Sequence, residues 1–296
     1  MSLLNTKAEL NRATREKYCL CAFNVDSLEY MPAIVQAAEE ERAPIMMEAN
    51  EVAIAGMGLK YFAMVARQRA EDAAVPVGIH LDHGSSVDSV KACLDAGFTS
   101  VMIDASRHPL KENIRITREV AELARKYNAY SEGEIGHVPA LREVSEGAGS
   151  ALVYTDPEEA GIFCRESGVD SLAVSIGTVH YMRREPLQLD FPLLARIREA
   201  VTVPLVLHGG AAVPDPDMEQ AVAQGIVKYN IAYKGYRAYL AGLAQGLRDV
   251  KEEVLPGKIF VYPSQVIKAG IESAKAEIRS KIRLLGASGK AKTGAA

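Results

Sequence analysis

The stretch Val75–Asp104, VPVGIHLDHGSSVDSVKACLDAGFTSVMID, contains one complete strand–helix–strand repeat. The apolar run from Val77 to Leu81 predicts a buried strand, Val87 to Ala96 has the spacing of an amphipathic helix, and Ser100 to Ile103 predicts a second strand. Two serines precede the helix and Gly97 follows it, which are typical start and stop residues. Two strands joined by a helix are expected to lie parallel in one sheet.

The same repeat continues along the chain. Six more short apolar runs resemble buried strands: Cys19–Phe23, Pro44–Glu48, Ala129–Glu132, Ser171–Ser175, Pro204–Leu207 and Ile226–Ile231. Helical periodicity covers Leu28–Arg42, Leu59–Ala73, Leu110–Tyr127, Pro157–Ser167, Pro192–Ala200, Met218–Gln224, Lys234–Glu253 and Ser264–Leu285. Eight such units predict an α/β fold, a closed (β/α)8 TIM barrel with additional N- and C-terminal helices. An open doubly wound sheet is the alternative, but no Gly-x-Gly-x-x-Gly follows the first strand.

Length and composition limit the function. The chain has 296 residues, a formal net charge of −4 and 48% hydrophobic residues. We expect one domain over residues 1–285 and a disordered tail over 286–296. No basic field favours nucleic acid, and no long apolar run or secretory signal favours a membrane or export. These features predict a cytoplasmic protein whose partner is a small molecule.

Polar residues follow most of the predicted strands. In a TIM barrel the C-terminal ends of the strands form the active site. Burying these groups unpaired would be costly, so convergence on one site explains them better than packing does. They are Asn24, Glu48, Asn50, Asp82, His83, Asp104, Ser106, Glu132, Glu134, His180, His208 and Asn230.

Three histidines close predicted strands. His83, His180 and His208 follow the third, sixth and seventh strands. Three imidazoles with an open fourth position are typical of a catalytic Zn²⁺ site, so we expect these residues to be the ligands. His80 lies within the third strand, out of step with His83, and His137 lies in a loop.

Asp82 directly precedes the first predicted ligand, and it has two interpretations. It could orient that ligand, or it could act as the general acid/base of an aldol cleavage. An aldol cleavage also needs an electron sink at a carbonyl, which zinc supplies as a Lewis acid. A lysine Schiff base is the rival mechanism. Lys228 is the only lysine in the predicted strands, and it falls inside the last one, so a metal mechanism fits better.

Four motifs in this order resemble the class II fructose- and tagatose-bisphosphate aldolases, and more closely the tagatose-bisphosphate branch. They are HLDHG at 80–84, SEGEIG at 131–136, SIGTVH at 175–180 and LVLHGG at 205–210, and the resemblance extends from residue 2 to residue 285. It implies a reversible aldol cleavage that releases dihydroxyacetone phosphate or a similar compound, with Asp82 catalytic and Glu134 near the zinc. A homodimer or homotetramer is expected, and a monovalent cation such as Na⁺ or K⁺ is a further expected cofactor.

The phosphate-binding segments depart from the family pattern. Tyr181 stands where the family has Gly, Ala211 where it has Ser, and Tyr233 where it has Thr. Backbone N–H groups can cradle an anion without side chains, so one interpretation retains phosphate recognition. The other is a carboxylate-bearing or non-phosphorylated donor. The resemblance places substrate at Asn24, Tyr181, Gly209, Gly210, Ala211, Asn230, Ile231, Ala232 and Tyr233.

Further positions are implied by the resemblance. Glu143 and Glu146 lie in the loop after the fifth strand, where the family closes its site with a mobile loop. Either glutamate could donate a proton or simply be solvated. Arg279 corresponds to a helix position from which the family reaches a distal phosphate, within one chain or across a subunit boundary, and Asp104 and Glu132 are expected behind the metal ligands.

Two other functions stay open. A metal-dependent sugar epimerase or isomerase would use the same kinds of groups, but its product would keep the carbon count of the substrate. A sugar-binding relative would have lost catalysis together with its phosphate site.

Overall fold

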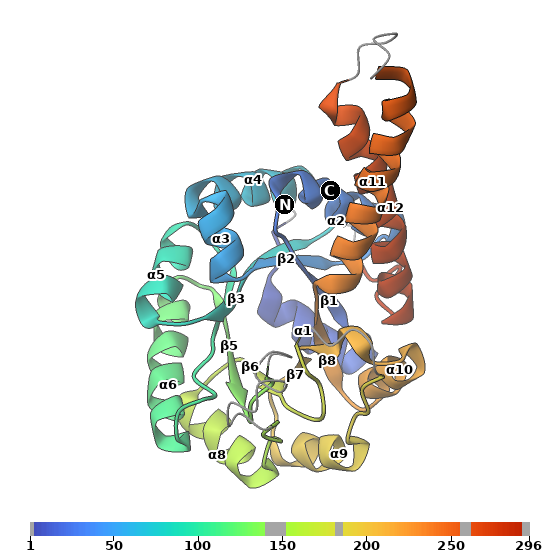
Figure 1. Ribbon diagram of the computed structural model, residues 1–296. Coiled ribbons are helices and arrows are strands. Elements are labelled where there is room, and N and C mark those ends of the chain that lie inside the picture. Colours follow the sequence, from blue (N-terminus) through green and yellow to red (C-terminus); the bar gives the residue numbers. More distant parts are fainter. Residues whose placement is uncertain (1–2, 140–151, 181–185, 255–261, 292–296) are drawn as a thin grey trace.

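The computed structural model describes residues 3–139, 152–180, 186–254 and 262–291. Its centre is a closed barrel of parallel strands in chain order, with β8 hydrogen-bonded to β1 (Figure 1). The strands are β1 (Leu20–Asn24), β2 (Ile45–Ala49), β3 (Val77–Gly84), β4 (Ser100–Ile103), β5 (Tyr130–Ile135), β6 (Ser171–Val174), β7 (Leu205–Leu207) and β8 (Ile226–Ile231). The predicted (β/α)8 barrel is confirmed.

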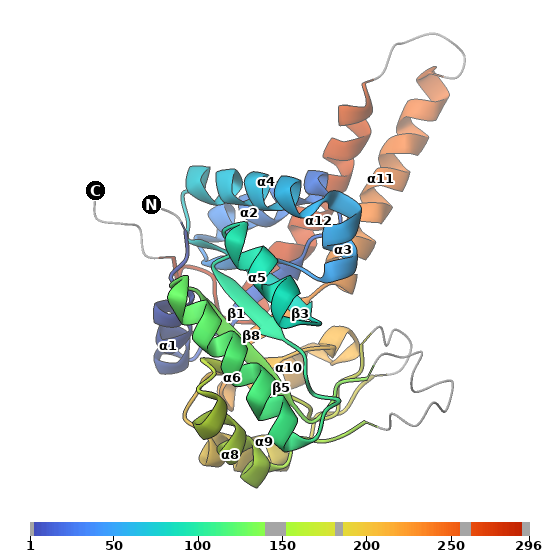
Figure 2. The same ribbon diagram turned by 90° about the vertical axis from the view of Figure 1, so that its left-hand side faces the viewer.

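Helices surround the barrel (Figures 1 and 2). They are α1 (Thr6–Glu16), α2 (Met31–Glu41), α3 (Glu51–Met57), α4 (Leu59–Asp72), α5 (Val87–Asp95), α6 (Leu110–Lys126), α8 (Pro157–Ser167), α9 (Phe191–Ala200), α10 (Asp215–Ala223), α11 (Tyr233–Val254) and α12 (Pro263–Leu284), with short 3-10 turns η1 (Leu28–Tyr30) and η2 (Gly210–Ala212). Within the described ranges, no helix is long and apolar enough to cross a bilayer.

Helix α3 was not predicted. Its N-cap is Asn50, whose side chain accepts a hydrogen bond from the backbone N–H of Ala53. An Asn side chain satisfies an otherwise unpaired N–H in the first turn of a helix. Asn50, which follows β2, therefore starts a short helix at the rim of the barrel.

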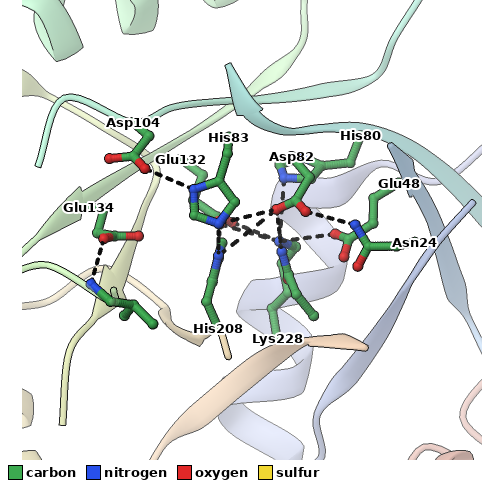
Figure 3. Close-up of polar contacts among 12 residues, drawn as sticks. Asn24, Glu48, His80, Asp82, His83, Asp104, Glu132, Glu134, His208 and Lys228 are labelled. Carbon is green, nitrogen blue, oxygen red and sulfur yellow. Dashed lines mark hydrogen bonds and ion pairs between the residues drawn. The ribbon is translucent and has the colours of Figure 1, made fainter. Parts of the chain in front are cut away.

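The end of β3 departs from regular alternation. His80 and Asp82 are two residues apart and point into the barrel (Figure 3), so regular alternation would turn His83 outward. However, the pairing of β3 with β4 shifts between Leu81 and Gly84, and His83 has a left-handed φ of 51°. This irregular backbone places the His83 imidazole Nε2 3.8 Å from a carboxylate oxygen of Asp82. Uncommon backbone conformations of this kind are often found at functional sites.

Inside the barrel, apolar and charged side chains occupy different parts. Met102, Ala173 and Val206 from β4, β6 and β7 form a separate buried apolar cluster. The main hydrophobic core joins the strands to the surrounding helices. The other strands supply the buried charged groups described below.

The C-terminal segment differs from the prediction. Helices α11 and α12 lie side by side and project beyond the barrel (Figures 1 and 2). After α12 the chain returns to the end of α2, where the N–H of Gly289 donates to the carbonyl of Glu41 and Ala287 is fully buried. The predicted tail therefore begins too early, because residues 286–291 pack against the fold. Residues 292–296 lie outside the described ranges.

Candidate active site

Three histidines from different strands meet at the C-terminal end of the barrel. Nε2 of His83 lies 2.9 Å from Nδ1 of His208, and the ring centres of His83 and His180 are 5.0 Å apart. One nitrogen from each of the three lies within 4.8 Å of the others. Three imidazole nitrogens are the donor set of a catalytic zinc site, so the residues present fit a divalent metal.

Carboxylates hold two of these imidazoles from behind (Figure 3). Asp104 Oδ2 lies 2.9 Å from Nδ1 of His83, and Glu132 Oε1 lies 2.8 Å from Nε2 of His208. In each of these two rings, one nitrogen contacts the carboxylate and the other nitrogen faces the ring of the other histidine. A carboxylate on the far nitrogen fixes the tautomer and the orientation of a metal-binding imidazole. Both carboxylates thus contact two of the predicted ligands on the nitrogen that faces away from the other histidine.

Asp82 lies beside the histidines at the cavity. Asn24 Nδ2 donates to one of its carboxylate oxygens at 2.7 Å, and Asn230 Nδ2 donates to the other at 2.8 Å. Burial acts to raise the pKa of Asp82, but the nearby positive charge of His83, His208 and Lys228 outweighs it and lowers the pKa. Asp82 is therefore an ionised carboxylate held in one orientation by two amides.

Glu134 lies on the far side of His83. Its Oε1 accepts a hydrogen bond from the backbone N–H of Val138 at 3.2 Å, and burial raises its pKa to about 8. A carboxylate oxygen of Glu134, an oxygen of Asp104 and a nitrogen of His83 also lie within 4.8 Å of one another. The structure thus places Glu134 beside His83 and Asp104, and its predicted role as a metal ligand stays a prediction.

A cavity of about 330 Å³ opens beside the histidines. Its lining includes many of the predicted site residues: Asn24, Asp82, His83, His180, His208, Gly209, Gly210, Ala211, Asn230, Ile231, Ala232 and Tyr233. The predicted site residues Tyr181, Glu143 and Glu146 lie outside the described ranges.

Arg279 was predicted at the substrate, and the structure places it elsewhere. Its Nε lies 2.8 Å from a carboxylate oxygen of Glu41, and its Nη1 lies 2.7 Å from one of Glu40. Both glutamates are on α2, and Arg279 is absent from the cavity lining. Within this one chain Arg279 joins α12 to α2, and a reach to a distal phosphate across a subunit boundary stays a prediction.

Several polar residues at the cavity were not predicted. Asp215, Lys234 and Lys281 line it from helices outside the barrel. Lys281 Nζ lies 2.8 Å and Lys234 Nζ 3.6 Å from Oδ1 of Asp215. Their positions depend on helix packing, so strand-end patterns in the sequence carried no signal for them.

Lys228 was interpreted as lying away from the site. It does not line the cavity, but its ammonium group bonds to Glu132 and Asn230 inside the barrel. Lys228 and Asn230 are two residues apart on one strand, so both side chains point to the same side. The predicted inward position of Asn230 was therefore a usable signal for Lys228.

Comparisons with known proteins agree with this geometry. Residues 4–290 match the family described as "Fructose-bisphosphate aldolase class-II". The chain is 38% identical over 295 residues to a fructose-bisphosphate aldolase of Geobacillus stearothermophilus, covering 98% of this chain and 99% of that one. It is 33% identical to a 6-phospho-5-dehydro-2-deoxy-D-gluconate aldolase of Bacillus subtilis, covering 98% of each. The crystal structure of the YdjI aldolase from Escherichia coli K12 superposes with a TM-score of 0.84 at 31% identity, covering 98% of this chain and all of that one.

Proposed function

Because the chain belongs to the class-II fructose-bisphosphate aldolase family, and so is a metal-dependent carbon–carbon lyase, we propose that it reversibly cleaves a ketose phosphate with zinc at His83, His180 and His208. The observation that carries this proposal is the meeting of the three imidazoles with the ionised Asp82 at one cavity. An aldol cleavage needs a base and an electron sink on the same substrate. This site offers both.

When bound, a divalent metal at the three histidines supplies a Lewis acid that polarises the donor carbonyl. The breaking bond joins a carbon of the donor fragment to a carbon that carries a hydroxyl group. Asp82 takes the proton from that hydroxyl. That hydroxyl becomes the carbonyl of the released aldehyde, and the electron pair of the carbon–carbon bond stays with the donor fragment. The donor carbon then accepts a proton and Asp82 releases the one it took, so the cleavage consumes no net proton. In the synthetic direction Asp82 returns the proton. Asn24 and Asn230 hold the carboxylate in the orientation that this transfer requires.

We further propose that the donor keeps its phosphate, although Ala211 offers no hydroxyl. Gly209 has a left-handed φ of 66° and is followed by the 3-10 turn η2. Successive residues in left-handed and right-handed conformations can point their backbone N–H groups toward one anion. Lys234 and Lys281 share the single carboxylate of Asp215, so this group of three side chains carries a net positive charge at one part of the cavity, while Asp26 and Asp82 line it elsewhere. Both relatives are named for phosphorylated sugars or sugar acids, which also supports a phosphate donor.

The direct test is to incubate zinc-loaded protein with tagatose and fructose 1,6-bisphosphates and to follow the products by carbon NMR. We expect triose phosphate and an aldehyde, and no cleavage by Asp82→Ala. A product with the carbon count of the substrate would favour an epimerase instead. Failure to cleave either bisphosphate while zinc is bound would favour a donor without phosphate.

We also propose that the protein is a homodimer or homotetramer. Leu240 and Leu247 lie seven residues apart on α11 and are 62% and 60% exposed, so they form an apolar strip on the projecting helix pair. Light scattering should give a mass above that of one chain, and Leu240→Glu with Leu247→Glu should lower it. A monomeric mass for the wild type would contradict this proposal. The tagatose preference, a monovalent cation and a cytoplasmic location stay predictions.

A further inference from the structure

Lys228 lies inside the barrel with 1% of its surface exposed. Its Nζ is 2.7 Å from Oδ1 of Asn230, 3.0 Å from Oε2 of Glu132 and 3.4 Å from Nε2 of His80. An ammonium group has three N–H donors and no acceptor. All three donors therefore have an acceptor in the structure, which fixes the direction of each.

Two of these contacts lead to different parts of the proposed catalytic centre. Glu132 bonds to the imidazole of His208, a proposed metal ligand, at 2.8 Å. Asn230 donates to Asp82, the proposed base, at 2.8 Å. One ammonium group thus contacts the carboxylate behind the metal ligand, as Figure 3 shows for Lys228 and Glu132, and the amide behind the base.

The third contact and the charge balance explain why the lysine is held so firmly. His80 Nδ1 lies 2.7 Å from the hydroxyl of Ser100, and burial lowers the pKa of His80 to about 3, which favours the neutral ring. Because an ammonium group can only donate, Nε2 is the acceptor in its contact with Lys228, and the ring proton lies on Nδ1 toward Ser100. Glu48 lies 3.7 Å from Nζ, but neither of its oxygens makes a hydrogen bond with the described residues. Glu132 is therefore the hydrogen-bonded counter-ion, and a buried charge without one would be strongly destabilising.

We propose that Lys228 is a positioning residue that sets the metal ligand His208 and the base Asp82 relative to each other, through Glu132 and Asn230. This inference rests on the proposed roles of His208 and Asp82. Lys228 does not line the cavity, so it acts on the reaction without touching substrate. Without the ammonium group, Glu132 and Asn230 lose their shared hydrogen-bond donor. His208 and Asp82 are then both held less firmly.

The test variant is Lys228→Met, which keeps the length of the side chain and removes all three donors. Lys228→Gln is a second variant that retains a shorter donor, in case the methionine variant does not fold. We expect zinc affinity, measured by chelator competition, to fall by about 10- to 100-fold because Glu132, the carboxylate that orients the ligating imidazole of His208, loses its counter-ion. The visible absorption bands of the Co²⁺-substituted protein should shift. At saturating zinc, kcat should fall by about 100-fold with KM little changed, because the base is misplaced.

The matched control is Arg12→Met, which removes a different buried charge. Arg12 bonds to Glu9 and Tyr18 at α1, away from the cavity. It should lower the melting temperature but leave zinc affinity, the cobalt spectrum and kcat unchanged. A folded Lys228→Met protein with wild-type zinc affinity and kcat would overturn the inference, and so would a loss confined to one of the two. The metal readouts need no substrate, so an error in the proposed substrate would leave them interpretable.

Discussion

Nε2 of His83 and Nδ1 of His208 face each other at 2.9 Å, while the second nitrogen of each ring lies against a carboxylate. The facing nitrogens are therefore the pair available to a metal. His208→Ala removes one of them, and we expect the purified variant to lose bound zinc and turnover but keep its fold. Metal analysis and far-ultraviolet circular dichroism check this. Zinc retained at wild-type stoichiometry would mean that His208 is not a ligand.

Asp82→Asn tests the base separately from the metal. The amide keeps the size of the side chain but cannot accept a proton, so we expect zinc to remain and kcat to fall by about 100-fold or more. Steady-state kinetics at saturating zinc measure the change. Near-normal turnover would leave Asp82 only the role of orienting a ligand.

Ala211→Ser tests whether phosphate lies at the turn after β7. A hydroxyl directed at a charged phosphate adds about 1.5 kcal/mol or more of binding, so KM for a bisphosphate substrate should fall by about tenfold. Ala212→Ser is the matched control, because Ala212 does not line the cavity. Equal KM values for Ala211→Ser and wild type would argue against phosphate at this turn.

Arg279→Ala tests whether that arginine acts through its contact with α2. Arg283 is the main cause that lowers the pKa of Glu41 to about 2; burial opposes the shift, and Arg279 contributes to it. A carboxylate with a lowered pKa stabilises the fold above its ordinary pKa, and the contribution is lost as the pH falls from about 4.5 toward 2. We therefore expect a lower melting temperature near neutral pH, and a smaller loss of stability with acid, than in the wild type.

The same substitution also tests whether Arg279 contacts substrate. Substrate KM should not change in Arg279→Ala, because the side chain is bonded to α2. Arg115→Ala is a suitable control. Arg115 is bonded to Glu112 and Glu119 on the exposed face of α6, so its loss should affect neither stability nor KM. A large rise in KM for Arg279→Ala alone would restore its predicted contact with substrate.

Much of the fold was predictable, because each strand is a short apolar run between turn residues. Ser100–Ile103 and Ile226–Ile231 were predicted with the bounds that the structure has. By contrast, β5 continues to Ile135 beyond the predicted end at Glu132. Its polar residues suggested the end of a strand, but the barrel interior satisfies Glu132 with a histidine and a lysine. Local patterns could not reveal such long-range partners.

The site was predictable to the extent that it follows strand ends. Asp82 and His83 could be placed in this way, but the inward turn of His83 depends on an irregularity in β3 that sequence alternation does not contain. Lys281 reaches the cavity from α12, while Arg279, two residues earlier, faces α2. Which face of a terminal helix meets the barrel depends on tertiary packing, so the sequence could not separate these two residues.

The most direct test of the central claim is to measure cleavage of a ketose bisphosphate before and after chelation of the metal. We expect zinc-loaded protein to release triose phosphate, the release to stop when zinc is removed, and added zinc to restore it. Cleavage that continues at the same rate in protein shown to be free of metal would contradict the role given to His83, His180 and His208.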